Sequence, residues 1–158
     1  MRGEPTPDLI VSIPGKPRTQ GSMSLVRSPD GREVARYAQE TVNHRNLVVG
    51  AVAGAWGSRV AIEGPVAVRL GFYYVRPKSH FGTGRNASTV KESAPRWPAT
   101  RNRDDIDKAS RLVLDALVIG GALADDGQVV VLRAEKRWQD PGLSPFTLIE
   151  MFDLDREW

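Results

Sequence analysis

Residues 105–138 read DIDKASRLVLDALVIGGALADDGQVVVLRAEKRW, and the pattern of this stretch is the most informative in the chain. Over residues 105–118 apolar side chains recur at helical spacing, at Ile106, Ala109, Leu112, Val113, Ala116 and Leu117. Acidic residues occupy the first turn, where the helix dipole favours them, and Gly120 and Gly121 form a stop. Residues 128–138 are β-branched and then basic, which is typical of a strand. The stretch therefore predicts a helix followed by a strand.

The flanking sequence predicts further strands and one more helix. Residues 65–75, PVAVRLGFYYV, alternate with period two and predict a long strand with one buried face. Residues 8–14 and 144–152 alternate in the same way. We expect the strand at 144–152 to form a hairpin with the strand at 128–138. Residues 35–56 have apolar groups at helical spacing and predict a helix that stops at Gly57.

These elements predict an α+β fold, with a mixed sheet covered by helices. A chain of 158 residues is long enough for one hydrophobic core, so we expect a single domain over residues 1–158. No apolar run approaches the roughly 20 residues of a membrane span, and the first residues do not resemble a secretion signal. We therefore expect a cytoplasmic protein.

Composition limits the chemistry of any site. The chain has no cysteine and only two histidines, so thiolate and histidine-built metal sites are excluded. Any metal ion would have carboxylate ligands, which favour Mg²⁺ or Mn²⁺. The sequence also lacks G-x-G-x-x-G and G-x-x-x-x-G-K-[ST], the patterns of dinucleotide-binding and P-loop folds.

Charge is concentrated in one long loop. Residues 76–103 carry seven basic side chains and one acidic, and residues 104–158 carry six basic and twelve acidic. From Arg76 to about Asp104 prolines, glycines and hydroxyls prevail without a sustained period, which predicts a binding loop or a mobile flap. A basic segment followed by carboxylates suits a protein that binds a polyanion and holds metal ions against it. A solvated loop before an acidic helix start explains the charges equally well.

Five aspartates lie in two short clusters at the ends of the predicted helix. Asp105 and Asp107 share a side only if the chain is extended or capping there, and of the adjacent Asp125 and Asp126 only one can face a site. The spacing alone fits a metal site, but it also fits an ordinary helix cap and an Asp-Asp-Gly turn. Helical spacing places Arg111 on the same face as Asp107 and Asp115.

Residues 103–130, RDDIDKASRLVLDALVIGGALADDGQVV, resemble the signature of the RusA family of Holliday junction resolvases. The shared features are an Asp-x-Asp step, a helix ending in Asp-Ala-Leu, a glycine-containing link, and Asp-Asp followed after one residue by Gln-Val. The segments IPGKPRTQGSMS and RPKSHFGTGRNASTVKESAP are similar to the phage and actinobacterial branch of that family. The resemblance spans about residues 9–138.

The resemblance implies a homodimeric, magnesium-dependent endonuclease that nicks four-way DNA junctions symmetrically. Asp105, Asp107 and Asp126 stand where the family has its metal-binding carboxylates. Arg111 stands where the family can carry a catalytic lysine, and because arginine is a poor proton donor, Lys108 is a candidate to share that role.

A second departure is Asp104, directly before the first carboxylate, where a basic residue or proline would be more usual. We expect it either to tune metal affinity or to repel DNA. Asp115 we interpret as structural, holding Arg111 or Lys108.

Together with this resemblance, the sequence predicts an Mg²⁺-dependent, or Mn²⁺-dependent, endodeoxyribonuclease acting on branched DNA in recombination and repair, with no membrane partner. Nine basic side chains are expected to contact phosphates: Lys16, Arg18, Arg76, Lys78, Arg85, Lys91, Arg96, Arg101 and Arg103. Two alternatives remain, a DNA-binding module without catalysis and a metal-dependent nuclease acting on RNA.

Overall fold

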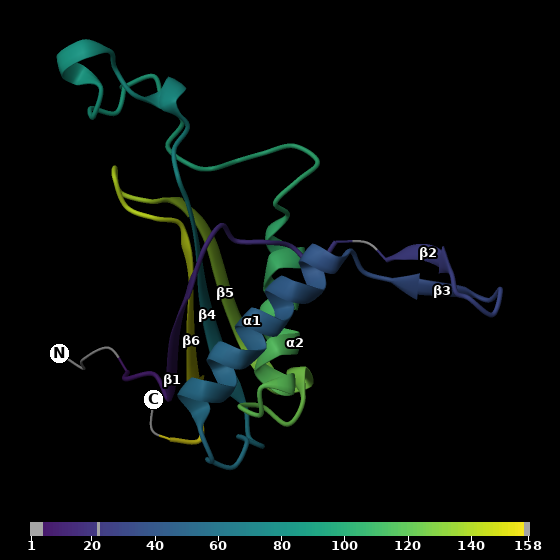
Figure 1. The fold of residues 1–158 in the computed structure, drawn as a ribbon. Coiled ribbons are helices and arrows are strands. Elements are labelled where there is room, and N and C mark those ends of the chain that lie inside the picture. Colours follow the sequence, from purple (N-terminus) through teal and green to yellow (C-terminus); the bar gives the residue numbers. More distant parts are fainter. Residues whose placement is uncertain (1–4, 22, 157–158) are drawn as a thin grey trace.

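A four-stranded mixed sheet forms the centre of the molecule (Figure 1). The structure is a computed structural model that describes residues 5–21 and 23–156. The strands lie in the order β1 (Leu9–Pro14), β6 (Phe146–Asp153), β4 (Val66–Tyr74) and β5 (Val129–Trp138). β6 runs antiparallel to both β1 and β4, whereas β4 and β5 are parallel. The α+β class and the single domain are as the sequence predicted.

Strands β5 and β6 do not form the expected hairpin, so that prediction was wrong. β4 lies between them. The long buried face of β4 and the alternating buried residues of β6 belong together at the centre of the sheet, while the exposed β5 suits an edge. The seven residues 139–145 can step over one intervening strand because neighbouring strands are only about 4.8 Å apart. Burial, not adjacency in sequence, decided the pairing.

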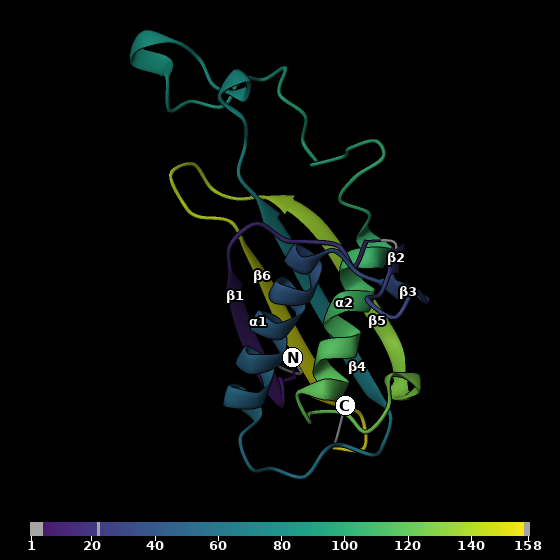
Figure 2. The same cartoon turned by 45° about the vertical axis from the view of Figure 1, so that its right-hand side comes forward.

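Two helices cover one face of this sheet (Figure 2). Helix α1 (Gln39–Trp56) packs against β1 and helix α2 (Ile106–Ile119) packs against β5. Five of the six apolar residues predicted for the buried face of α2 are buried; Ile106, in the first turn, is partly exposed. α1 begins four residues later than expected because residues 33–36 are extended, and it ends at Gly57, whose positive φ closes the helix.

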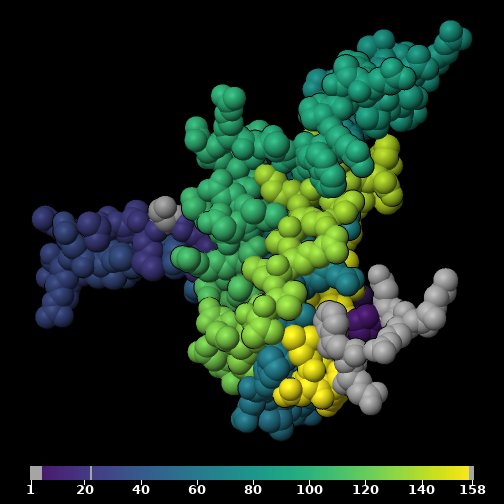
Figure 3. All heavy atoms as spheres, turned by 180° about the vertical axis from the view of Figure 1, so that it is seen from behind, coloured from purple at the N-terminus to yellow at the C-terminus, as the bar shows by residue number. Residues whose placement is uncertain are grey.

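A two-stranded hairpin projects from the body and was not predicted (Figures 1 and 3). It consists of β2 (Ser24–Arg27) and β3 (Glu33–Arg36), paired antiparallel. All eight strand residues are exposed, including Leu25 at 70%. No face of the hairpin is buried, so the sequence had no alternation of buried and exposed positions to reveal it.

Residues 76–103, here called the basic arm, form the long loop that the sequence predicted, and they extend past one end of the sheet (Figures 1 and 2). The arm contains two short turns, η1 (Lys78–His80) and η2 (Gly84–Asn86), and one isolated bridge between Phe81 and Val90. At its base, Arg76 Nη1 and Trp138 Nε1 each donate a hydrogen bond of 3.0 Å to the Pro95 carbonyl. The arm is therefore tied to the end of β5.

None of the helices in the described part of the chain is both long and apolar enough to cross a bilayer.

Candidate active site

The start of α2 meets the condition that the Asp-x-Asp spacing sets, because the backbone is still extended at Asp105. The two aspartates nevertheless line neighbouring depressions and not the same one. Asp105 is the N-cap residue with extended backbone angles, and Asp107 lies in the first turn. Before them, Asn102 and Asp104 both have positive φ, which turns the chain sharply from the basic arm into the helix. Because Asp105 precedes the first helical turn, its carboxylate and that of Asp107 are free of the opposed directions they would have within a helix.

Asp107, Arg111 and Asp126 line one depression of about 450 Å³, which we call the aspartate depression. Its walls also include Ser110 and Leu114 of α2 and Leu132 and Ala134 of β5. Asp105 lines the neighbouring depression, and Ile106 belongs to both. The structure thus brings two of the three predicted carboxylates together with the predicted cation and leaves the third beside them.

Asp125 and Asp126 are adjacent in sequence, and they have different surroundings in the structure. Asp125 Oδ1 accepts a hydrogen bond of 2.7 Å from the Gly127 backbone N–H, and the Asp125 N–H donates to Gln128 Oε1 at 2.7 Å. The Gln128 amide in turn donates to the Ile62 and Gly64 carbonyls. This capping box fixes the turn η3 (Asp126–Gln128), so that Asp125 is structural and Asp126 faces the aspartate depression.

Lys108 is engaged with a carboxylate. Its Nζ lies 2.9 Å from Asp105 Oδ2, and this hydrogen bond, together with the charge of Asp105, raises the pKa of Lys108. A lysine whose pKa is raised holds its proton more firmly at neutral pH. Lys108 is thus placed to orient Asp105, and Arg111 is the cation inside the aspartate depression.

The expected role of Asp115 needs correction. Asp115 Oδ2 accepts a hydrogen bond of 2.8 Å from Gln20 Nε2, and not from Arg111 or Lys108. The Gln20 backbone N–H also donates to the Lys108 carbonyl at 3.2 Å. Asp115 therefore fastens the loop after β1 to α2, the helix that carries the candidate catalytic groups.

Asp104 lies among cations. Its carboxylate is 3.6 Å from Lys16 Nζ and 4.0 Å from Arg103 Nε, and its carbonyl accepts a hydrogen bond of 3.0 Å from Lys136 Nζ. These contacts hold the turn that presents Asp105. The sequence did not single out Lys136, because the basic end of β5 gave no sign of which alternate residue would face α2.

The nine predicted phosphate contacts differ in how freely they can act. Arg18 pairs with Glu40 at 2.9 Å, Lys91 Nζ donates to the Ser79 carbonyl, and Arg96 lies over the ring of Trp97. Arg76 is bound at the base of the arm, and Lys16 and Arg103 neighbour Asp104. Within the described residues, the side chains of Lys78, Arg85 and Arg101 have no hydrogen bond or ion pair, so their charges are fully available.

The carboxylates suit a hard divalent cation. Among the described residues no three histidine, cysteine or acidic side chains lie close enough together to hold a metal ion by themselves. Mg²⁺ does not require three, since it is usually bound through one or two carboxylates, waters and substrate phosphates. Asp107 and Asp126 supply two carboxylates in one depression, with Asp105 next to it. The residues present therefore fit magnesium completed by a phosphate.

Comparison with known proteins identifies the family. The family model described as endodeoxyribonuclease RusA matches residues 14–144, which is most of the chain. No curated protein matches the chain significantly. The matched region contains the last residue of β1, both helices, the basic arm and every residue of the aspartate depression. The chain therefore belongs to the RusA family of endodeoxyribonucleases.

Proposed function

We propose that this protein is a magnesium-dependent endonuclease that resolves four-way DNA junctions by paired, symmetric nicks. The observation that carries the proposal is the convergence of Asp107, Asp126 and Arg111 in one depression on a chain of the RusA family. Two carboxylates beside a guanidinium suit phosphodiester hydrolysis, in which negative charge develops on the phosphate. We place this activity in the cytoplasm, with no membrane partner.

In this mechanism Asp107 and Asp126 would hold Mg²⁺ or Mn²⁺, with Asp105 as the neighbouring candidate ligand. The bound ion would neutralise charge on the scissile phosphate and lower the pKa of a water for attack. Arg111 donates hydrogen bonds to the phosphate oxygens as charge develops, and its guanidinium keeps its proton throughout. Lys108 orients Asp105 through their 2.9 Å contact.

The basic arm supplies most of the affinity for DNA. Among the described residues nothing pairs with the side chains of Lys78, Arg85 and Arg101, and these lie on an arm that reaches beyond the body (Figure 3). Contacts of this kind bind phosphates regardless of sequence and release counterions, so affinity should fall steeply with salt. Selectivity for branched DNA then depends on which DNA shape can contact the arm and the body of the protein at the same time.

Paired nicks require two active sites related by symmetry, and a twofold homodimer is the simplest source of them. We assign the dimer contact to the β2–β3 hairpin. An isolated two-stranded hairpin is only marginally stable in water, and this one exposes Leu25, Val26 and Val34. A second copy that covers these side chains would stabilise the hairpin and give the dimer an apolar contact.

The deciding experiment is cleavage of a synthetic mobile four-way junction with and without Mg²⁺. We expect paired nicks in opposing strands with Mg²⁺ or Mn²⁺, none with EDTA, and little cleavage of a linear duplex of the same sequence. A DNA-binding module without catalysis would shift the junction in a gel but never cut it. Faster cleavage of a structured RNA than of the junction would favour the RNA-directed alternative.

A further inference from the structure

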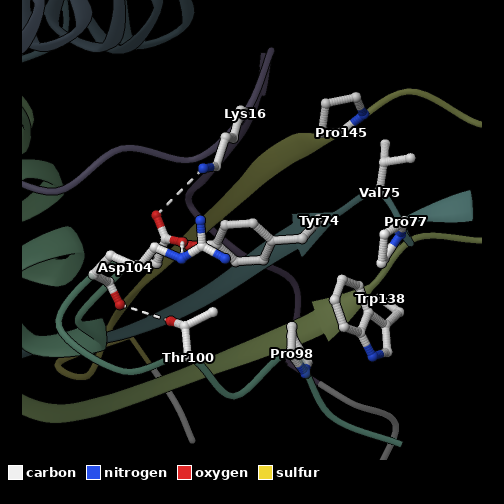
Figure 4. A pocket seen from close by; sticks show the side chains of 10 residues that line it. Lys16, Tyr74, Val75, Pro77, Pro98, Thr100, Asp104, Trp138 and Pro145 are labelled. Atoms are coloured by element: carbon white, nitrogen blue, oxygen red, sulfur yellow. Dashed lines mark hydrogen bonds and ion pairs between the residues drawn. The ribbon is translucent and has the colours of Figure 1, made fainter. Parts of the chain in front are cut away.

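A second cavity lies at the base of the basic arm, next to the candidate active site (Figure 4). It measures about 370 Å³, within the range of small-ligand pockets. Four parts of the chain meet there: the loop after β1, the end of β4, residues 98–104 at the end of the arm, and the chain around the β5–β6 connection. Their side chains give the cavity an apolar interior and a charged rim.

The interior has flat and rigid walls. Tyr74 and Trp138 supply aromatic surfaces, and Pro77, Pro98 and Pro145 supply aliphatic ones (Figure 4). The indole of Trp138 is held in place from several sides. Its Nε1 donates to the Pro95 carbonyl, the Arg76 guanidinium lies 5.2 Å from its ring centroid, and His80 meets it edge-on. A fixed aromatic ring can stack on a planar ligand at little cost in side-chain entropy.

Tyr74 adds an unsatisfied polar group to the cavity wall. The residue is only 7% exposed, and its hydroxyl has no hydrogen-bond partner in the described structure. Burial, and then the negative charge of Asp104, raise the pKa of Tyr74 to about 12, so the phenol keeps its proton. The group is therefore a hydrogen-bond donor without an acceptor, and because its oxygen is buried, a ligand reaches it only when neighbouring side chains move.

The rim is charged and is shared with the candidate active site. Lys16 lies beside the Asp104 carboxylate at the cavity (Figure 4). Arg103 also lines the cavity and is the second cation near Asp104. Pro98, Thr100, Arg103 and Asp104 also line the depression that contains Asp105. Asp104 and Asp105 are consecutive, so their Cα atoms are about 3.8 Å apart. A phosphate held at Asp105 would bring the base of the same or the next nucleotide to the cavity.

Planar apolar walls, a hydrogen-bond donor without an acceptor and a cationic rim are together complementary to a nucleotide, which has a flat base and a negatively charged phosphate. We infer that this cavity receives one unstacked nucleobase of the bound DNA, adjacent to the scissile phosphate, and that it sets a base preference for cleavage. The inference rests on the proposed function, because it takes the DNA to lie across the aspartate depression. Tyr74 and Trp138 contact the base, and Lys16 and Arg103 contact its flanking phosphates.

Branched DNA suits such a cavity. Extruding a base costs least where it is already poorly stacked, and the bases at a branch point lose a stacking neighbour. Stacking on aromatic side chains tolerates any base, whereas hydrogen bonds at the rim discriminate among them. The cavity would therefore favour both a branch point and a particular base at one position.

The test fills the cavity without touching the aspartates. Val75 lines it and is 53% exposed, so Val75→Trp can place an indole in the space without disturbing the core. Val60→Trp, at a position that is 84% exposed and does not line the cavity, is the matched control. Both variants and the wild type are mixed, in EDTA, with four-way junctions that carry a single 2-aminopurine at successive positions around the branch point.

We expect wild type and Val60→Trp to change the fluorescence at one position, and Val75→Trp to abolish that change while junction affinity stays within about threefold. In Mg²⁺, cleavage of junctions with each of the four bases at that position should differ by about tenfold for wild type and become uniform for Val75→Trp. An unchanged fluorescence pattern and base preference in Val75→Trp would overturn the inference. Because the fluorescence is read without metal, a wild type that shows the signal but never cleaves would refute the proposed function alone.

Discussion

At the scale of single residues, Asp107 is the carboxylate whose loss should separate binding from cleavage. On the proposed mechanism, Asp107→Asn removes a metal ligand and a negative charge beside the phosphate. We expect junction cleavage to fall at least about a hundredfold, a barrier increase of ~2.7 kcal/mol, with binding retained or tighter. Rates at saturating enzyme and gel-shift titrations measure the two effects.

Asp115→Asn is the control for Asp107→Asn. It makes the same change on the same helix, and the new amide oxygen can still accept the Gln20 hydrogen bond. It should cleave at close to the wild-type rate. If Asp107→Asn instead loses binding together with cleavage and unfolds at a lower temperature, Asp107 stabilises the fold and is not a metal ligand.

Arg111 tests what the position beside the aspartates requires. If it needs only a cation near the phosphate, Arg111→Lys should retain activity within about tenfold, ~1.4 kcal/mol, and Arg111→Ala should lose about a hundredfold or more with little change in binding. If proton donation is limiting, Arg111→Lys should be faster and should lose rate as the pH rises past the pKa of the new lysine.

Full activity in Arg111→Ala would remove Arg111 from the mechanism. Lys108 would then be the remaining cation, and Lys108→Ala should be inactive. The 2.9 Å pair with Asp105 gives a different expectation, because Lys108→Ala should release Asp105 and raise the Mg²⁺ concentration needed for half-maximal cleavage. A magnesium titration of both alanine variants distinguishes a catalytic lysine from one that positions a ligand.

At the scale of elements, the periodicity of apolar residues predicted those helices and strands whose formation depends on residues close together in sequence. The period-two run of β4 and the helical period of α2 specify buried faces, and both elements formed almost within the expected bounds. Spacing within α2 also placed Asp107 and Arg111 on one face. The β5–β6 pairing failed because it depends on which strands are buried on both sides, a property of the assembled sheet.

The rest of the site depends on contacts between distant segments. Asp126 was assigned by resemblance, and only the folded chain shows it in the same depression as Asp107. The link from Gln20 to Asp115 joins residues 95 positions apart, and the cavity beside Trp138 needs four segments. The periodicity of a segment does not predict such long-range contacts, since the same segment could pack against many other parts of the chain.

The basic arm should bind through charge alone. The side chains of Arg85 and Arg101 have no partners in the described structure, so Arg85→Glu with Arg101→Glu should weaken binding to all DNA shapes without harming the fold. The slope of log affinity against log salt should decrease by about one for each phosphate that the variant no longer neutralises. Fluorescence anisotropy between low and moderate salt measures it for a junction and a linear duplex.

Arg85→Lys with Arg101→Lys keeps both charges and should leave the slope unchanged. Lys91 is less suitable for this test because its Nζ hydrogen-bonds to the Ser79 carbonyl and supports the arm itself. A slope that stays the same in the doubly acidic variant would show that the arm does not track phosphates.

At the scale of the whole molecule, two projections leave a compact body in different directions (Figures 1 and 3). The basic arm continues from the end of the sheet where Trp138 and Asp104 lie, beside the candidate active site. The hairpin carries exposed apolar groups and is joined to the body through the loop that Gln20 fastens to α2. We interpret the arm as the DNA-binding projection and the hairpin as the one that joins two copies.

The dimer assignment predicts how cleavage loses its symmetry. Leu25→Glu places a charge on the most exposed apolar residue of the hairpin. Light scattering should therefore show a monomer for this variant and a dimer for the wild type. On a supercoiled plasmid with a cruciform, paired nicks give linear DNA, whereas a monomer should give nicked circles. Val130→Glu, on the exposed edge of β5, should leave the dimer and the linear product intact. If Val130→Glu dissociates the dimer and Leu25→Glu does not, the dimer contact lies at the sheet edge, where two β5 strands could pair. If the wild type is a monomer and still linearises the plasmid, paired cleavage does not require a dimer.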